Sequence, residues 1–164
     1  MKTFVFYSSS IGIGMLLASC IRPISQGPSA PSVRQYTSNG KQIYFTATSQ
    51  RSDPITFTLA NGGGMMGGMM GSRMSGMIAC ATCHGADGRG GQVQMMMTTF
   101  EAPDIRYTAL IEGDEQPPYT DETIKRAITQ GVDPAGKALE WQMPRWSMSA
   151  DDLNDLLAYL KTLK

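Results

Sequence analysis

The pentapeptide Cys80-Ala-Thr-Cys83-His84 constrains this chain more than any other feature of its sequence. On a helix the two cysteines stand three positions apart and therefore lie on one face. Two thiols held in this way can add to the two vinyl groups at one edge of a porphyrin. The imidazole of His84 follows directly and can bind the iron as a proximal ligand. This spacing is typical of a c-type haem attachment site, so we predict one covalently bound haem c at Cys80 and Cys83.

Other uses of a Cys-x-x-Cys pair agree less well with the rest of the sequence. A structural zinc ion takes four cysteine or histidine ligands. The whole chain has three cysteines and one histidine, and one of these cysteines, Cys20, has a separate predicted role. A thioredoxin-like site would need a βαβ pattern around the motif, and none is visible. A simple disulfide between Cys80 and Cys83 stays open as an alternative.

Length and charge favour one small domain and exclude some classes of function. The 164 residues suit a single domain with additional segments. The formal net charge is zero, so nothing points to a nucleic-acid-binding protein. Once the N-terminus is set aside, no apolar run reaches the length of a membrane-spanning helix.

The N-terminus has the pattern of an export signal. Lys2 precedes an apolar stretch over residues 4–17. Leu17-Ala18-Ser19-Cys20 resembles the lipobox of bacterial lipoproteins, which implies cleavage before Cys20 and acylation of that residue. More than one acyl chain anchors a protein stably. We therefore expect a signal peptide at residues 1–19 and a lipid-anchored protein on the periplasmic side of a membrane. The alternative is an ordinary cleaved signal with an incidental Cys20.

Two segments are predicted between this anchor and the haem motif. Residues 20–39 are rich in proline and serine and are expected to form a solvated linker. Residues 40–71 are expected to form an extension. Apolar and polar residues alternate on both sides of the turn sequence at residues 51–54, which predicts a β-hairpin over residues 41–60.

Methionine and glycine make up most of residues 61–77. Glycine at this density opposes a stable helix. Thioether sulfurs are soft ligands that suit Cu(I). The alternative is a flexible connector whose methionines cover apolar surface. The candidate copper ligands are Met65, Met66, Met69, Met70, Met74 and Met77.

Three helices are predicted from the haem motif onwards. The first begins near residue 72 and carries the cysteines. The second spans residues 121–130, with Thr120 as its N-cap. The third follows Ser149, with Asp152 as the acidic partner of a capping box. Glycines at residues 85 and 131 are expected to end the first two helices. The third helix carries an apolar stripe of Leu153, Leu156, Leu157, Leu160 and Leu163.

A six-coordinate haem needs a second axial ligand. Because His84 is the only histidine, two histidine ligands from one chain are excluded. Methionine is the other common choice, and it raises the reduction potential. Met143 is the preferred candidate because Pro144 disfavours helical geometry at Met143 and stiffens its loop. Packing of Met143 into the core is the alternative. The other candidate ligands are Met95, Met96, Met97 and Met148.

Residues 72–164 resemble a class I cytochrome c domain of the bacterial monohaem type. The resemblance rests on the haem motif and its glycine-rich loop to residue 91, on Ala102-Pro103-Asp104, on Met143-Pro144 and on the terminal leucine-rich helix. It implies an all-α fold of three to five short helices around one covalently bound haem, preceded by the hairpin-like extension.

The resemblance also implies roles for single residues. Cys80 and Cys83 would carry the thioethers, and His84 and Met143 would be the axial ligands. The carbonyl of Pro103 would accept a hydrogen bond from the imidazole Nδ1. Two further side chains, Trp146 and Tyr107, are candidates for lining the haem pocket, and Tyr159 matches an aromatic that packs the last helix across the first.

One departure from the family pattern concerns the first helix. That helix usually begins with a glycine and an aromatic residue shortly before the first cysteine, where this chain is rich in methionine and glycine. A similar sequence motif, Gly40-Lys41-Gln42-Ile43-Tyr44, occurs far upstream.

The expected function is that of a membrane-tethered electron carrier and not of an enzyme. The cofactor performs the redox chemistry, and the protein supplies ligands and a docking surface for redox partners. Nothing in the sequence indicates a general base, a nucleophile or a substrate pocket. Three alternatives remain: a haem subunit of a larger oxidoreductase, a copper-handling or redox-sensing lipoprotein, and a catalytic or gas-binding haem protein with an open sixth position.

Overall fold

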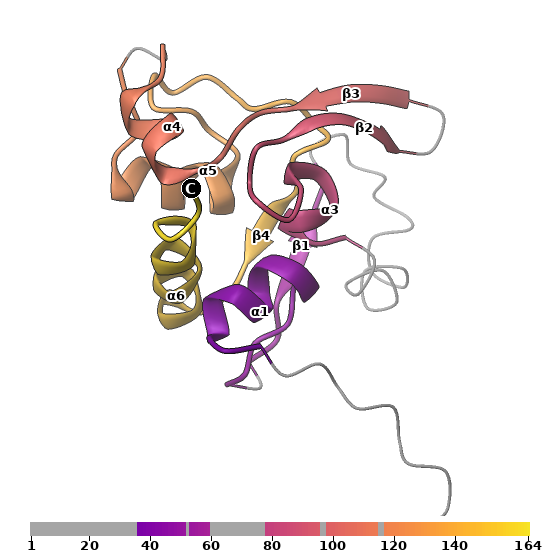
Figure 1. Cartoon of the computed structure of the whole chain (residues 1–164), viewed down its shortest axis with the longest axis vertical. Coiled ribbons are helices and arrows are strands. Elements are labelled where there is room, and N and C mark those ends of the chain that lie inside the picture. Colours follow the sequence, from indigo (N-terminus) through magenta and orange to yellow (C-terminus); the bar gives the residue numbers. More distant parts are fainter. Residues whose placement is uncertain (1–35, 52, 60–77, 96–97, 115–116) are drawn as a thin grey trace, which may run out of the picture. The chain divides into compact units, whose positions relative to one another are not determined.

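The computed structural model describes residues 36–51, 53–59, 78–95, 98–114 and 117–164, which all belong to one compact unit spanning residues 34–164. The predicted signal peptide, Cys20, most of the predicted linker and the candidate copper ligands lie outside the described residues. The described helices are α1 (Asn39–Thr46), α3 (Cys80–His84), α4 (Tyr107–Glu112), α5 (Asp121–Gln130) and α6 (Ala150–Leu160) (Figure 1). The described strands are β1 (Thr56–Thr58), β2 (Gly91–Met95), β3 (Thr98–Ala102) and β4 (Arg145–Ser147).

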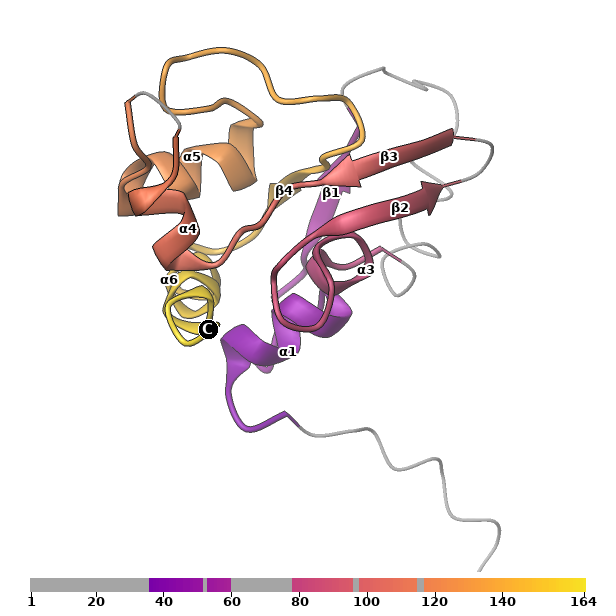
Figure 2. The ribbon, with the colours of Figure 1, turned by 45° about the horizontal axis from the view of Figure 1, so that its top comes forward.

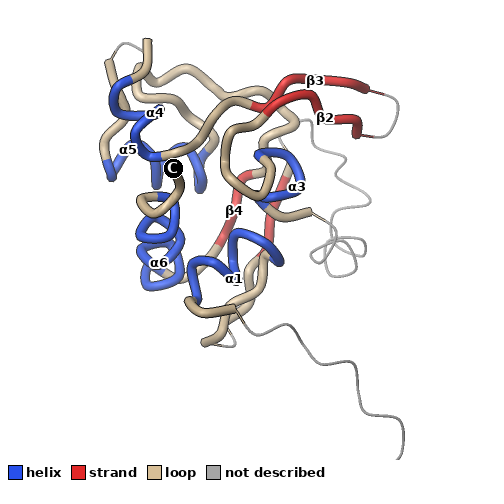
Figure 3. The backbone as a smooth tube through the Cα atoms, viewed as in Figure 1, coloured by secondary structure: helices blue, strands red, loops and turns tan. Residues whose placement is uncertain are grey.

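The strands form two small antiparallel sheets among the helices (Figure 3). β1 pairs with β4, which places Phe57 opposite Trp146. β2 pairs with β3 in a hairpin that projects away from the helices (Figure 2). The predicted helical architecture is therefore correct in outline, but the expectation of an all-α fold is too narrow, because two strand pairs connect and extend the helices.

Residues 39–46 form a helix, so the predicted β-hairpin over residues 41–60 is wrong. The Ser38 hydroxyl caps α1 by accepting a hydrogen bond from the Lys41 amide at 3.3 Å. Ile43, Tyr44 and Ala47 are buried, which is the spacing of one helical face. The polar–apolar alternation over residues 43–47 was misleading because the partner of this segment is another helix. β1 is a real strand, but it pairs with β4.

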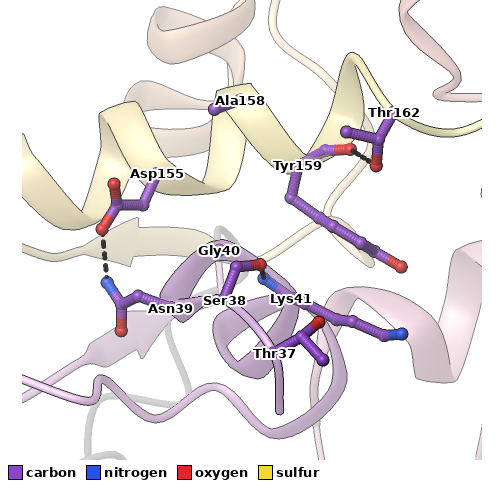
Figure 4. Close-up of a pocket in the computed structure, with 9 residues that line it drawn as sticks. All are labelled: Thr37, Ser38, Asn39, Gly40, Lys41, Asp155, Ala158, Tyr159 and Thr162. Atoms are coloured by element: carbon purple, nitrogen blue, oxygen red, sulfur yellow. Dashed lines mark hydrogen bonds between the residues drawn. The ribbon is translucent and has the colours of Figure 1, made fainter.

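Helix α1 packs directly against α6 at Gly40 (Figure 4). A Cβ atom at Gly40 would lie 1.9 Å from the carbonyl oxygen of Asp155. Glycine is therefore required for the two backbones to come this close. The ring of Tyr159 lies 5.2 Å from the ring of Tyr44 between centroids, so Tyr159 packs α6 across α1, whereas the predicted first helix was the one that carries the cysteines.

A buried carboxylate joins the same two helices. Asp152 is fully buried, and its Oδ1 accepts hydrogen bonds from Asn39 Nδ2 and Ser49 Oγ, both at 2.7 Å. Ser149 caps α6 through the Asp152 amide at 3.2 Å. Ser149 is thus the N-cap, as predicted, while the hydrogen bonds of the Asp152 side chain come from the region of α1.

The predicted helix over residues 121–130 and the leucine stripe of the last helix are confirmed. Thr120 caps α5, and Gly131 follows it in left-handed geometry with φ of 65°. The buried leucines of α6 lie against α1 and α5, so this stripe forms much of the core. They are Leu156, Leu157 and Leu160.

Candidate haem site

Helix α3 is the haem motif itself, Cys80–His84. Ala79 before it is extended, with φ of −140° and ψ of 165°. The helix therefore does not run through residues 78 and 79 as predicted, and its predicted start near residue 72 lies outside the described residues. Gly85 ends the helix, as predicted, with φ of 76°. A short helix suffices here because it only has to set the spacing of two thiols and one imidazole.

The two thiols are free and partly exposed. Burial raises the pKa of Cys80 to about 12, and it also raises the pKa of Cys83. Both side chains are therefore neutral at physiological pH. The alternative of a disulfide between them is not formed in the structure. Two neutral thiols beside buried Ile78 and Ala79 fit the apolar edge of a porphyrin.

The imidazole of His84 is buried, with 6% of the residue exposed. Its Nδ1 lies 2.9 Å from the carbonyl oxygen of Pro103. Because a carbonyl can only accept, Nδ1 carries the proton and donates it, as the resemblance implied. Burial lowers the pKa of His84, so the ring is neutral. The free electron pair is then on Nε2, the state in which histidine binds a metal.

A glycine brings the Pro103 carbonyl to this position. The Gly90 amide donates a hydrogen bond to the carbonyl oxygen of His84 at 2.9 Å. A Cβ atom at Gly90 would lie 2.1 Å from the carbonyl oxygen of Ala102 and 2.5 Å from that of Pro103. Any other residue would push the two segments apart, so Gly90 is needed for the close approach.

Helix α1 reaches the site through one buried side chain. The Tyr44 hydroxyl donates a hydrogen bond of 2.6 Å to the carbonyl oxygen of Gly85, directly after the histidine. Tyr44 has no exposed surface. This contact links the α1–α6 pair to the haem motif, and it was not predicted.

The predicted second ligand lies in the loop before β4. Met143 is partly buried and packs against the core, and its amide donates to the carbonyl oxygen of Glu140 at 3.1 Å in a turn. Met148 also packs against the core, so burial alone does not separate these two candidates. Met95 belongs to β2, and the candidates at positions 96 and 97 lie outside the described residues.

The two aromatic candidates for the haem pocket have structural contacts of their own. Trp146 is buried in β4, and its ring lies 5.1 Å from that of Phe57 between centroids. The Tyr107 hydroxyl donates to Asp121 at 2.9 Å, which joins α4 to α5. Lys161 lies over the Tyr107 ring, 4.8 Å from its centroid. Whether either ring also contacts a haem stays a prediction.

A pocket of about 410 Å³ lies between the start of α1 and α6 (Figure 4). Neither the cysteines nor the histidine of the motif lines it, so we do not assign it to the cofactor. Among the described residues, no group of three or more histidine, cysteine, aspartate or glutamate side chains could hold a metal ion.

The fold and the site define a small, mainly helical domain with a segment suited to covalent haem attachment. A family model described as Cytochrome c matches residues 37–164. The chain belongs to the cytochrome c family. A domain of this family binds covalently attached haem c and serves haem-based electron transfer as a carrier, in contrast to a catalytic enzyme. Comparison with curated proteins and with solved structures finds no match.

The matched region changes the interpretation of residues 40–71. It begins at residue 37, whereas the predicted cytochrome domain begins at residue 72. Helix α1 lies inside the match and contributes Ile43 and Tyr44 to the core. The sequence motif Gly40-Lys41-Gln42-Ile43-Tyr44 was the signal that could have identified α1 as the first helix of the domain.

Proposed function

We propose that this protein is a membrane-tethered monohaem cytochrome c that carries single electrons between redox partners outside the cytoplasmic membrane. The observation that carries the proposal is the buried, neutral imidazole of His84, held by Pro103 and preceded by two free thiols. When bound, the haem supplies the Fe(II)/Fe(III) couple.

On the proximal side, His84 is the proposed axial ligand. The hydrogen bond to Pro103 holds the ring in one orientation and makes Nε2 a stronger donor. The Gly85 carbonyl accepts a hydrogen bond from Tyr44, so the C-terminal end of the short α3 segment is tied to α1.

On the distal side, Met143 is the proposed ligand. Its loop turns back between Glu140 and Met143 and is followed by Pro144, which limits the conformations open to it. A loop with few conformations loses little entropy when a weak thioether–iron bond forms. Trp146 and Tyr107 are the proposed aromatic residues of the haem pocket.

The ligands can be tested on the full-length protein produced together with haem-attachment machinery. Covalent haem gives an intact mass above that of the polypeptide and lipid, and Cys80→Ser with Cys83→Ser removes it. Met143→Ala is expected to make the haem high-spin and to lower its reduction potential. Met148→Ala and Met95→Ala are the matched controls and should leave both nearly unchanged. A larger effect of Met148→Ala would identify the other sulfur as the ligand.

We further propose a lipid anchor at Cys20 after removal of residues 1–19, which places the domain on the periplasmic side of a membrane. The lipobox-like pattern supports this proposal. None of the helices that the structure describes is long and apolar enough to cross a bilayer. The intact mass of the mature protein checks this proposal: it should correspond to a chain that begins at Cys20 and carries acyl groups, and a mature chain without added lipid mass would contradict acylation.

The proposed partners are redox proteins that dock weakly and transiently. The chain is sparsely charged, with 17% charged residues and no net charge, so strong electrostatic steering is not expected. Electron transfer rates with a soluble small-molecule reductant and with a partner protein should therefore change little with ionic strength. A steep salt dependence would instead indicate a charged docking surface.

A further inference from the structure

We propose that Arg145 is a positioning residue that holds the Met143 loop in the geometry needed for axial ligation. The inference rests on the proposed function, because it requires Met143 to be the ligand. It concerns the guanidinium of Arg145 and the four backbone carbonyls that surround it, those of Gly131, Leu139, Glu140 and Met143, which we call the carbonyl cluster.

Four donors of the guanidinium meet four acceptors. Nη1 donates to the carbonyl of Glu140 at 3.1 Å and to that of Met143. Nη2 donates to the carbonyl of Leu139 at 2.8 Å and to that of Gly131 at 3.3 Å. Each terminal nitrogen of arginine carries two N–H groups, so all four are used on the carbonyl cluster. Glu140 and Met143 are the first and last residues of the turn that presents Met143, and the other two acceptors precede it.

The guanidinium is attached to a well-packed part of the domain. Arg145 is the first residue of β4 and lies opposite Thr58 of β1. The next residue, Trp146, is buried against Phe57. Because the backbone of Arg145 is held in the sheet, the hydrogen bonds of its side chain hold the Met143 loop in a fixed position relative to the β1–β4 pair.

Gly131 provides the space for this arrangement. A Cβ atom at Gly131 would lie 2.0 Å from Nε and 2.2 Å from Cζ of Arg145. The guanidinium therefore occupies the place where a side chain of residue 131 would be. The φ of residue 131 is 65°, which also favours glycine at this position.

The consequence for ligation follows from entropy. A thioether competes with water and with added ligands for iron, and its bond is weakened by every conformation that the free loop can reach. Hydrogen bonds to a charged donor are among the stronger ones in proteins. Loss of the guanidinium should therefore increase the fraction of molecules in which Met143 is away from the iron.

The experiment measures the affinity of the oxidised full-length holoprotein for added imidazole, which displaces the thioether, together with the thioether–iron(III) charge-transfer band. For Arg145→Gln we expect imidazole to bind about tenfold tighter and the band to weaken. Arg145→Lys should fall between this variant and the wild type, because an ammonium group cannot reproduce the planar fork.

Arg126 offers a matched control in the same region. Its Nη2 donates to the carbonyls of Asp133 and Pro134, neither of which belongs to the carbonyl cluster. Arg126→Gln should leave the imidazole affinity within about twofold of the wild type. The proposal would be overturned if Arg145→Gln kept the wild-type affinity for imidazole. It would also be overturned if Arg126→Gln bound imidazole as tightly as Arg145→Gln does.

A glycine pair tests the same idea without changing the charge. Gly131→Ala displaces the guanidinium, whereas Gly136→Ala has the same kind of positive φ, 93°, and an open space around its Cβ. Gly131→Ala should tighten imidazole binding as Arg145→Gln does, and Gly136→Ala should not. Equal effects of the two alanines would mean that backbone strain, and not the guanidinium, controls the loop.

The failure of this inference is distinguishable from the failure of the proposed ligation. A wild-type protein without the thioether band would show that Met143 is not the ligand, and both ideas would be wrong. A wild-type protein with the band, whose Arg145 variants keep it and bind imidazole unchanged, would contradict only the role of Arg145.

Discussion

The haem-attachment segment, residues 78–103, and the interface between α1 and α6 are built by different means. In the first, the thiols and the imidazole come from five consecutive residues, and a five-residue helix sets their spacing. In the second, Asn39 reaches Asp152 across 113 positions of sequence. Chemistry is therefore encoded locally in this protein, whereas the packing that supports it depends on distant residues.

The largest effect is expected when the close contact between α1 and α6 is broken. Gly40→Leu places a side chain where the Asp155 carbonyl stands, and neither backbone can move without separating the helices. We expect the free energy of unfolding to fall by about 3 kcal/mol or more. Denaturant unfolding of the holoprotein measures this loss, while the intact mass should still include haem.

Thr37→Leu is the control for Gly40→Leu, because Thr37 is exposed beside the same interface. It should change the stability by less than about 0.5 kcal/mol. A Gly40→Leu protein as stable as the wild type would show that α1 does not need to approach α6 closely.

A smaller loss is expected when the buried carboxylate of the interface is removed. Asp152→Ala removes the buried acceptor that Asn39 and Ser49 share, and Asn39 keeps only its hydrogen bond to Asp155. The expected loss is about 2–4 kcal/mol of unfolding free energy. Asp151→Ala, an exposed aspartate in the same helical turn, is the matched control and should be near neutral. Equal losses would indicate an effect of helix charge and not of the buried contacts.

The carboxylates of Asp152 and Asp155, both in α6, predict that stability depends on pH. Burial raises the pKa of Asp152, but hydrogen bonds from Ser49 and Asn39 outweigh it, so the pKa is lowered overall. Hydrogen bonds from Arg51 and Asn39 lower the pKa of Asp155. Because these groups bind protons less readily in the folded state, they stabilise it above the unfolded pKa of about 3.9. This stability is lost as the pH falls through the folded pKa values.

Unfolding free energies measured at pH 7, 4 and 3 check this prediction. The decrease towards low pH should be smaller in a protein with both Asp152→Asn and Asp155→Asn, since neither amide titrates. An unchanged pH profile in the double variant would assign the acid sensitivity to other carboxylates.

The smallest effect is expected at the contact that joins the two regions. Tyr44→Phe keeps the buried ring but removes the hydroxyl that donates to the Gly85 carbonyl. We expect a loss of about 1–2 kcal/mol and little change in the haem spectrum. Tyr159→Phe, the same ring change on the partner helix, should cost less, because the described contacts of Tyr159 with α1 are made by the ring. Equal losses would argue against coupling through Gly85.

Sequence reasoning succeeded where the signals are local. The caps at Thr120 and Ser149 and the leucines of the last helix predicted α5 and α6 because capping and periodicity involve residues within one turn or two. It failed at residues 41–47, where alternating apolar residues suggested a strand. Packing against α6 selects the helix there, and the alternation of apolar residues does not contain that information.

At the site, the same division holds. The thiols and the imidazole were identified from five consecutive residues, and the family resemblance supplied the contact between His84 and Pro103. Tyr44 was not identified because its hydrogen bond to Gly85 joins segments 41 positions apart. Arg145 was not identified because the conformation of its loop, and not the residue types, gathers the carbonyls around the guanidinium.

The sequence by itself determined the chemistry of this protein, because two sulfurs and an imidazole need only one helical turn to be placed correctly. The tertiary structure decided which helix completes the core, how the Pro103 carbonyl reaches the imidazole and what holds the loop of Met143. These features depend on glycines that leave room for other atoms: a backbone carbonyl at Gly40 and at Gly90, and the Arg145 guanidinium at Gly131. The sequence shows these glycines, but only the tertiary structure shows which atoms fill the space beside them.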